Sequence, residues 1–179
     1  FILPIEGNKL PGVISYRDIA DTEAMIDAAK RYKKAVVIGG GLLGLEAANG
    51  LKLRGMDATV VHVMPWLMER QLDERAGKLL QASLEAKGIE FRMQAQTEAL
   101  VAGESGRVAA LRFKGGEQIA ADLVVMAVGI RPNTELAAKS GLAVSQRPGG
   151  ILVTDTLQTL TDPRIYSVGE CVNHRGTAY

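Results

Sequence analysis

The feature that most constrains this chain is a glycine cluster between an apolar run and a segment with helical character. Residues 36–46 read VVIGGGLLGLE, and Gly39, Gly41 and Gly44 have the spacing G-x-G-x-x-G. The β-branched residues before them show no alternation, which is typical of a parallel strand buried on both faces. Because the pattern predicts a helix from about Leu42 to Arg54, the cluster is a strand–turn–helix junction, the context in which this spacing indicates dinucleotide binding.

Each glycine has an expected part in that junction. Gly39 permits the sharp turn, Gly41 lets the backbone approach a pyrophosphate, and Gly44 lets the helix pack closely on the strand. Free amides at the helix start and the helix dipole favour phosphate charge. The residues expected at this phosphate site are Gly39, Gly40, Gly41, Leu42, Leu43 and Gly44. The alternative is a glycine-rich turn that holds no ligand.

The second strand, predicted over Ala58–Val63, raises the question of which nucleotide binds. Dinucleotide folds usually place an acid there, about 20 residues after the glycines, to hold the ribose 2′-hydroxyl. In this chain the position falls on His62, with Val63 beside it. Neutral histidine accepts a hydrogen bond from a hydroxyl and protonated histidine favours a 2′-phosphate, so this strand leaves NADH against NADPH open. A solvated histidine at a strand end is the alternative.

Two charged residues near these segments are further candidates. Arg70 follows the second strand in a loop, where it either reaches phosphate or ribose or is a surface charge. Glu46 lies one turn into the helix after the glycines, where a carboxylate favours the positive helix end. It is either a stabilising helix-start charge or a neighbour of the nicotinamide.

The rest of the pattern predicts an α/β fold: a Rossmann-like βαβαβ parallel sheet with a small antiparallel β-meander. Asp21 or Thr22 is expected to cap a helix that runs through about Arg31. Apolar residues at helical spacing predict a helix over Leu72–Lys87. The strands expected beyond it are 89–93, then 97–102, 107–114 and 118–121 as the meander, then 123–128, 151–153 and 165–168.

Two of these later strands end in glycine. The strand in VVMAVGIRPN, residues 124–133, stops at Gly129, and Ile130 follows. By strand order we expect Gly129 beside the first glycine loop, at the sheet edge where ligands bind in open α/β folds. The tail reads RIYSVGE and places Gly169 and Glu170 after another short strand.

Composition excludes several classes of function. The net charge is +1 over 179 residues and no Lys/Arg block stands out, so no nucleic-acid partner is expected. The apolar stretches are strand-sized, so no membrane span is expected. One cysteine, Cys171, allows no internal disulfide and no cysteine-based metal cluster, and it fits a reducing cytoplasm.

Three segments together, VVIGGGLLGLE, AVGIRPN and IYSVGE, resemble the pyridine nucleotide-disulfide oxidoreductase superfamily of flavoproteins. Within it, HVMPWLMERQLDERAG and GECVNHRGTAY are similar to the large subunits of assimilatory NAD(P)H nitrite reductases. The resemblance implies that hydride passes from NAD(P)H to FAD, with Glu46 near the nicotinamide and Gly169-Glu170 near the FAD ribityl chain. It further implies that electrons continue to iron–sulfur clusters and sirohaem, which reduce nitrite to ammonia in nitrate assimilation.

The resemblance also implies a domain layout. Residues 1–30 are expected to end a split FAD-domain segment and form a linker helix, residues 31–130 to bind NAD(P)H, and residues 131–179 to return into the FAD domain. One dinucleotide fingerprint and no cluster cysteines suggest a fragment that is inactive alone, with sirohaem and iron–sulfur centres outside it. The expected partners are NAD(P)H, with NADH favoured, the FAD and reductase domains of the full-length protein, and a small subunit.

Two other functions fit the same residues. One is a rubredoxin or ferredoxin reductase of the same superfamily. The other is a non-enzymatic dinucleotide sensor with the same βαβ core, although a sensor has no need of the GIRPN and SVGE segments.

Overall fold

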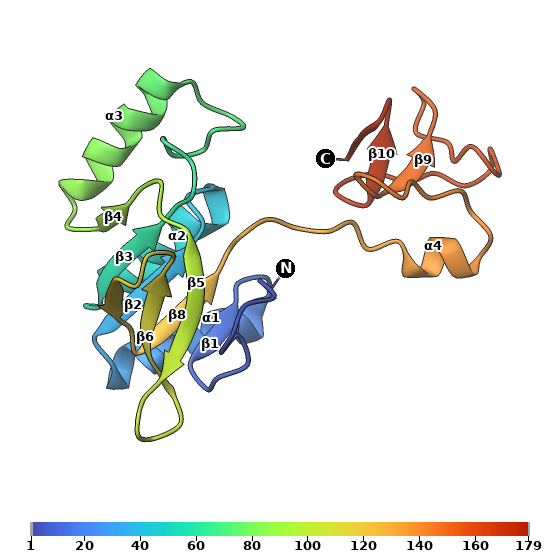
Figure 1. The fold of residues 1–179 in the computed structure, drawn as a ribbon. Coiled ribbons are helices and arrows are strands. Elements are labelled where there is room, and N and C mark those ends of the chain that lie inside the picture. The colour runs from blue at the N-terminus through green and yellow to red at the C-terminus, as the bar shows by residue number, and fades with distance from the viewer. Residues whose placement is uncertain (1, 179) are drawn as a thin grey trace. The chain divides into compact units, whose positions relative to one another are not determined.

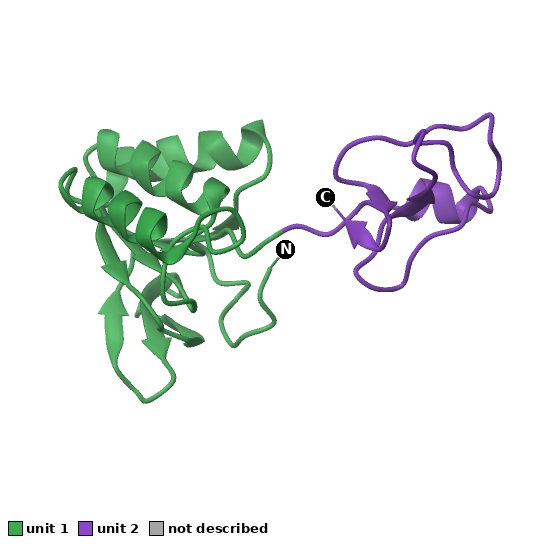
Figure 2. Ribbon diagram, turned by 90° about the horizontal axis from the view of Figure 1, so that it is seen from above, with its two compact units in different colours: residues 1–129 green, residues 130–179 purple. Residues whose placement is uncertain are grey.

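The structure is a computed structural model that describes residues 2–178. The chain forms two compact units, residues 1–129 and residues 130–179 (Figures 1 and 2). Each unit has its own sheet or sheets, and each is described separately.

Unit 1 is built on a parallel sheet of five strands in the order β1-β8-β2-β3-β4. All four neighbouring pairs are parallel. The strands are β1 (Val13–Ser15), β2 (Lys34–Ile38), β3 (Asp57–Val61), β4 (Glu90–Arg92) and β8 (Leu123–Met126). The sequence-predicted βαβαβ order is therefore confirmed, with strand ends that differ by one or two residues.

Three helices connect these strands: α1 (Ile19–Arg31), α2 (Leu42–Leu53) and α3 (Glu74–Glu85). The cap of α1 differs from the prediction. Asp18, not Asp21 or Thr22, is the N-cap, and Asp21 completes a capping box with it. Both residues satisfy backbone N–H groups that the first helical turn leaves without partners.

The parallel sheet separates two apolar layers because alternate side chains of each strand point to opposite faces. Val37 and Val60 belong to the cluster that includes the helix residues Leu45, Ala48 and Leu51. On the other face, Val36, Ile38 and Val61 pack with residues of the meander. Figure 2 shows the helices of unit 1 gathered on one side of its strands. Central strands covered on both faces explain why their sequence is continuously apolar.

The meander is a separate antiparallel sheet of β5 (Thr97–Ala102), β6 (Val108–Phe113) and β7 (Gln118–Ala120), in that order. Its apolar side chains Leu100, Leu111 and Phe113 are buried against the parallel sheet. The alternation in the sequence predicted these strands, and the structure confirms them.

Unit 2 contains α4 (Glu135–Lys139) and a sheet of β9 (Ile151–Val153), β10 (Val172–His174) and β11 (Thr177–Ala178). The strand predicted over 165–168 is wrong: that segment makes one isolated bridge, between Tyr166 and Gln158. The side chains of Tyr166 and Val168 in this segment are exposed, so they are not packed against other residues of the unit as those of a sheet strand would be. No helix among the described residues is long and apolar enough to cross a membrane.

Candidate functional site

The glycine loop lies where the sheet changes direction. From β2 the chain moves outward through β3 and β4, and then returns to place β8 on the other side of β2. Gly39 follows the last residue of β2, and Gly129 follows the end of β8, at the same edge of the sheet. In open α/β sheets this switch point, at the carboxyl ends of the strands, is where ligands bind.

The glycines of the loop have different physical reasons to be glycine. Gly39 has φ +121°, and an added Cβ would lie 2.2 Å from the Ala127 carbonyl oxygen. A Cβ on Gly44 would lie 1.9 Å from the Gly39 carbonyl oxygen, so helix and loop touch backbone to backbone there. Gly41 has no atom within 4 Å of an added Cβ. The protein's own packing therefore requires a missing side chain at Gly39 and Gly44, but not at Gly41.

The N-terminus of α2 has no side-chain cap, unlike the N-termini of the other two helices of unit 1. Asp18 caps α1 and Asp73 caps α3, each through its carboxylate. The N-cap of α2 is Gly41, which offers no side-chain hydrogen bond. The first N–H groups of a helix have no intrahelical acceptor, and together with the helix dipole they attract an anion.

A cleft of about 530 Å³ is lined by the glycine loop and by Leu42, the first residue of this helix. Eight of the sequence-predicted site residues line it: Gly39, Gly40, Gly41, Leu42, His62, Val63, Arg70 and Gly129. Strand order predicted that Gly129 lies beside the first glycine loop, and the shared cleft confirms that placement. The lining residues that the sequence analysis missed include Leu3, Ile5, Glu69, Gln71, Ala95, Gln96 and Thr97.

His62 lines this cleft, and both of its ring nitrogens are held by hydrogen bonds. The backbone N–H of Gly40 donates to His62 Nδ1 at 3.0 Å, and His62 Nε2 lies 3.1 Å from Glu69 Oε2. Because a backbone N–H can only donate, Nδ1 is the acceptor and Nε2 carries the proton toward Glu69. Only 7% of His62 is exposed, so it is not the solvated strand-end residue considered above. Both ring nitrogens therefore already have partners within the protein.

The segment after β3 folds back onto the glycine loop. The Met68 N–H donates to the Gly40 carbonyl at 3.0 Å, and Met68 has the left-handed φ of +54°. Leu67 is completely buried, and Trp66 Nε1 donates to the Leu72 carbonyl at 3.0 Å. These contacts carry Glu69 to the cleft, so a residue remote from the glycine motif in sequence becomes part of its wall.

Three sequence-predicted site residues of unit 1, Leu43, Gly44 and Glu46, do not line the cleft. They lie on α2, where Gly44 is buried in its packing contact and Glu46 is exposed. Ile130, Gly169 and Glu170 belong to unit 2. Their roles toward nicotinamide or flavin remain predictions.

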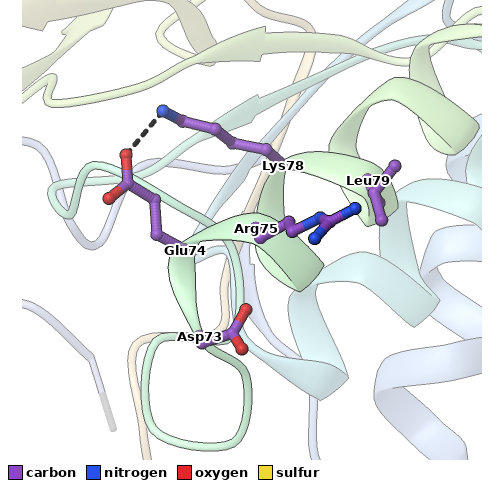
Figure 3. Close-up of a pocket in the computed structure, with 5 residues that line it drawn as sticks. All are labelled: Asp73, Glu74, Arg75, Lys78 and Leu79. Carbon is purple, nitrogen blue, oxygen red and sulfur yellow. Dashed lines mark hydrogen bonds and ion pairs between the residues drawn. The ribbon is translucent and has the colours of Figure 1, made fainter.

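A second hollow lies along α3, where Asp73, Glu74, Arg75, Lys78 and Leu79 line it (Figure 3). Glu74 and Lys78 form an ion pair one helical turn apart. All five residues come from one helix and its cap, and their two acidic and two basic side chains carry no formal net charge. Among residues 2–178 no group of acidic, histidine or cysteine side chains is arranged to hold a metal.

The family model and the similar proteins that match this chain are all oxidoreductases or electron-transfer proteins. The family model described as pyridine nucleotide-disulphide oxidoreductase matches residues 1–179. A nitrite reductase (NAD(P)H) of Bacillus subtilis is 59% identical over 179 residues, which is 100% of this chain and 22% of the relative. The assimilatory nitrate reductase electron transfer subunit of the same organism is 46% identical over 180 residues, covering 99% of this chain and 22% of the relative.

A solved structure supports the fold. The ferredoxin reductase for the CYP199A2 system from Rhodopseudomonas palustris superposes with a TM-score of 0.89 at 29% identity. The match covers 97% of this chain and 42% of that chain. The chain thus spans less than half the length of each of these relatives.

Proposed function

This chain belongs to the pyridine nucleotide-disulphide oxidoreductase family, and on that premise we propose that it binds NAD(P)H in the cleft above its glycine loop. In the whole protein it would be the NAD(P)H-binding portion of a flavoprotein reductase. The observation that carries the proposal is the pairing of an uncapped helix start with a glycine, Gly41, whose missing side chain the protein's own packing does not need.

The residues fit a dinucleotide in a specific way. The pyrophosphate would accept hydrogen bonds from the first N–H groups of α2, where Gly41 leaves room for the ligand to approach the backbone. Apolar side chains of Leu3, Ile5 and Val63 line the same cleft and would cover ring faces. Gly129 would let the nucleotide lie against the end of β8.

The chain's own part in the reaction is binding and orientation. The nicotinamide, when bound, supplies the hydride, and FAD in the full-length protein would receive it. Glu46, exposed on α2, is proposed to lie near the nicotinamide, and Gly169 and Glu170 near the flavin. In this division of labour residues 31–130 would hold the nucleotide, with Leu3 and Ile5 contributing to the same cleft, and residues 131–179 would return into the FAD domain.

Nitrite is the terminal acceptor that we propose for the whole protein. The support is the 59% identity to a nitrite reductase, together with the resemblance of HVMPWLMERQLDERAG and GECVNHRGTAY to nitrite reductase large subunits noted above. Iron–sulfur and sirohaem centres and a small subunit would then lie outside these residues. The fold likeness to a ferredoxin reductase keeps transfer to a small redox protein as the second candidate.

Replacing Gly41 with valine tests the nucleotide site. The branched side chain would occupy the space that the pyrophosphate needs, while the folded chain has room for it because no atom lies within 4 Å of its Cβ position. We expect the variant to keep its circular dichroism spectrum and to lose at least about tenfold in NADH affinity by calorimetry. Gly50→Val is the matched control, because Gly50 lies on the same helix and its Cβ position is also open.

Unchanged NADH affinity in a folded Gly41→Val protein would contradict the pyrophosphate assignment. An equal loss in the Gly50→Val control would mean that the effect comes from the helix and not from the site.

A further inference from the structure

The cleft contains one acidic and one basic side chain among the described residues that line it, Glu69 and Arg70. They are neighbours in sequence but differ in how they are held. Glu69 bonds to His62 through Oε2, and its side chain is 24% exposed. Arg70 is exposed and makes no side-chain hydrogen bond or ion pair with residues 2–178. Glu69 is therefore the charged group whose position is fixed before any ligand arrives.

The position matters because of where β3 ends. His62 directly follows β3, the strand after the glycine-loop helix, and in dinucleotide folds that strand end faces the adenosine ribose. Histidine occupies the place of the usual acid, and both of its ring nitrogens are engaged. The nearby acid is Glu69, seven residues further along the chain. Its carboxylate is hydrogen-bonded to the His62 ring, and the residue lines the same cleft.

We propose that Glu69 determines the nucleotide preference of this cleft: its carboxylate accepts the 2′-hydroxyl of an unphosphorylated adenosine ribose and repels a 2′-phosphate. The inference rests on the proposed function and names the ligand class within it, NADH in preference to NADPH. His62 is the positioning residue. It does not contact the ribose but links the carboxylate to the glycine loop through Gly40.

The hydrogen-bond chain explains how the carboxylate can be both fixed and available. Glu69 uses Oε2 for His62, and Oε1 has no hydrogen-bond partner among residues 2–178. A carboxylate accepts several hydrogen bonds, so the ribose hydroxyl can be received without releasing His62. The backbone bond from Met68 to Gly40 holds the preceding residue of the same segment against the loop. Little ordering is then left to occur on binding, which favours affinity.

Glu69→Gln is the variant that isolates the charge. Its amide oxygen can still accept from His62 Nε2, so the segment should keep its fold, whereas the repulsion of a 2′-phosphate is removed. We measure the dissociation constants of NADH and NADPH by calorimetry for the wild-type chain, Glu69→Gln and the control Glu85→Gln, an exposed acid on α3 away from the cleft. The wild-type chain should bind NADH more tightly, and Glu69→Gln should shift the NADPH/NADH ratio by about tenfold or more toward NADPH. Glu85→Gln should leave the ratio unchanged.

A second variant tests the positioning role of His62. His62→Gln keeps a polar side chain but cannot reproduce the geometry in which one ring bridges Gly40 and Glu69. We expect it to weaken the preference for NADH in the same direction as Glu69→Gln, with a smaller loss of affinity for NADPH than for NADH. A uniform loss for both nucleotides would assign His62 to loop packing alone.

The outcomes separate this inference from the proposed function. Binding of neither nucleotide by the wild-type chain would contradict the proposed function itself. Binding that Gly41→Val abolishes, with a ratio that Glu69→Gln does not change, would overturn only the role of Glu69. A wild-type preference for NADPH that Arg70→Gln removes would overturn it as well and assign the 2′-position to Arg70.

Discussion

At the scale of single residues, the glycine loop shows how one sequence motif combines unrelated constraints. Gly39 is fixed by a left-handed backbone and by contact with Ala127, and Gly44 by contact with Gly39. Gly41 has no such internal constraint. Folding therefore requires glycine at positions 39 and 44, whereas Gly41 is available for recognition of a ligand.

This division predicts opposite stability effects for two alanine substitutions on α2. Gly44→Ala places a methyl group 1.9 Å from the Gly39 carbonyl oxygen, so the loop or helix must move. We expect a loss of about 1–3 kcal/mol in the free energy of unfolding, the usual cost of overpacking. Gly50→Ala meets no atom within 4 Å and should instead stabilise by about 0.5–1 kcal/mol, because alanine favours the helix.

Urea unfolding followed by Trp66 fluorescence measures both changes. Equal effects of the two substitutions would mean that the contact between Gly44 and Gly39 does not limit the packing of α2 on its strand.

At the scale of elements, the sequence predicted those helices and strands that are determined by a local pattern of apolar residues. Continuous β-branched runs gave the buried strands, two-residue alternation gave the meander, and helical spacing gave α3. The missed features depend on contacts distant in sequence. Residues 165–168 have strand-like composition, but within residues 2–178 they form a single β-bridge, from Tyr166 to Gln158, so no ladder forms.

The site residues, too, differ in whether a local sequence pattern marks them. The glycine motif and Gly129 follow from a pattern and a strand order, and both line the cleft. Glu69 reaches the cleft because Met68 adopts a left-handed backbone and bonds to Gly40. Neither event has a local sequence signature, since methionine does not favour that conformation. The usual position of the ribose-binding acid, about 20 residues after the glycines, predicted His62, and the structure shows His62 hydrogen-bonded to Glu69.

In unit 2, the turn after β9 is joined to the β10–β11 hairpin by Asp155. Its carboxylate accepts hydrogen bonds from Arg175 at 2.7 and 3.0 Å and from His174 at 2.8 Å. These bonds, first from Arg175 and then from His174, hold the pKa of Asp155 well below its usual value. A carboxyl with a depressed folded-state pKa stabilises the fold above its unfolded pKa, and that contribution is lost as the pH falls.

We therefore expect unit 2 to lose thermal stability as the pH drops below about 4, the unfolded pKa of an aspartate. Asp155→Asn should be less stable near neutral pH and should show less of this acid dependence. The effect should be modest because the group is exposed to solvent. Melting followed by the NMR methyl signals of Val153 and Val172 measures it, with Glu135→Gln as the control within the same unit. An acid dependence that persists unchanged in Asp155→Asn would assign it to other carboxyls.

At the scale of the whole molecule, the two units carry different shares of the proposed chemistry. Unit 1 contains the parallel sheet, the switch point and the cleft. Unit 2 contains Gly169 and Glu170, whose proposed neighbour is a flavin of the full-length protein. Nucleotide binding should therefore be a property of unit 1.

The nucleotide site is tested most directly by titrating the isotope-labelled chain with NADH and following the backbone amide NMR signals. We expect saturable shifts at residues around the cleft, centred on Gly40, Gly41, Leu42 and Glu69, with the amides of the hollow along α3 unchanged. Shifts that cluster on α3 or in unit 2, or no saturable shifts at all, would contradict the claim that the glycine-loop cleft is the nucleotide site.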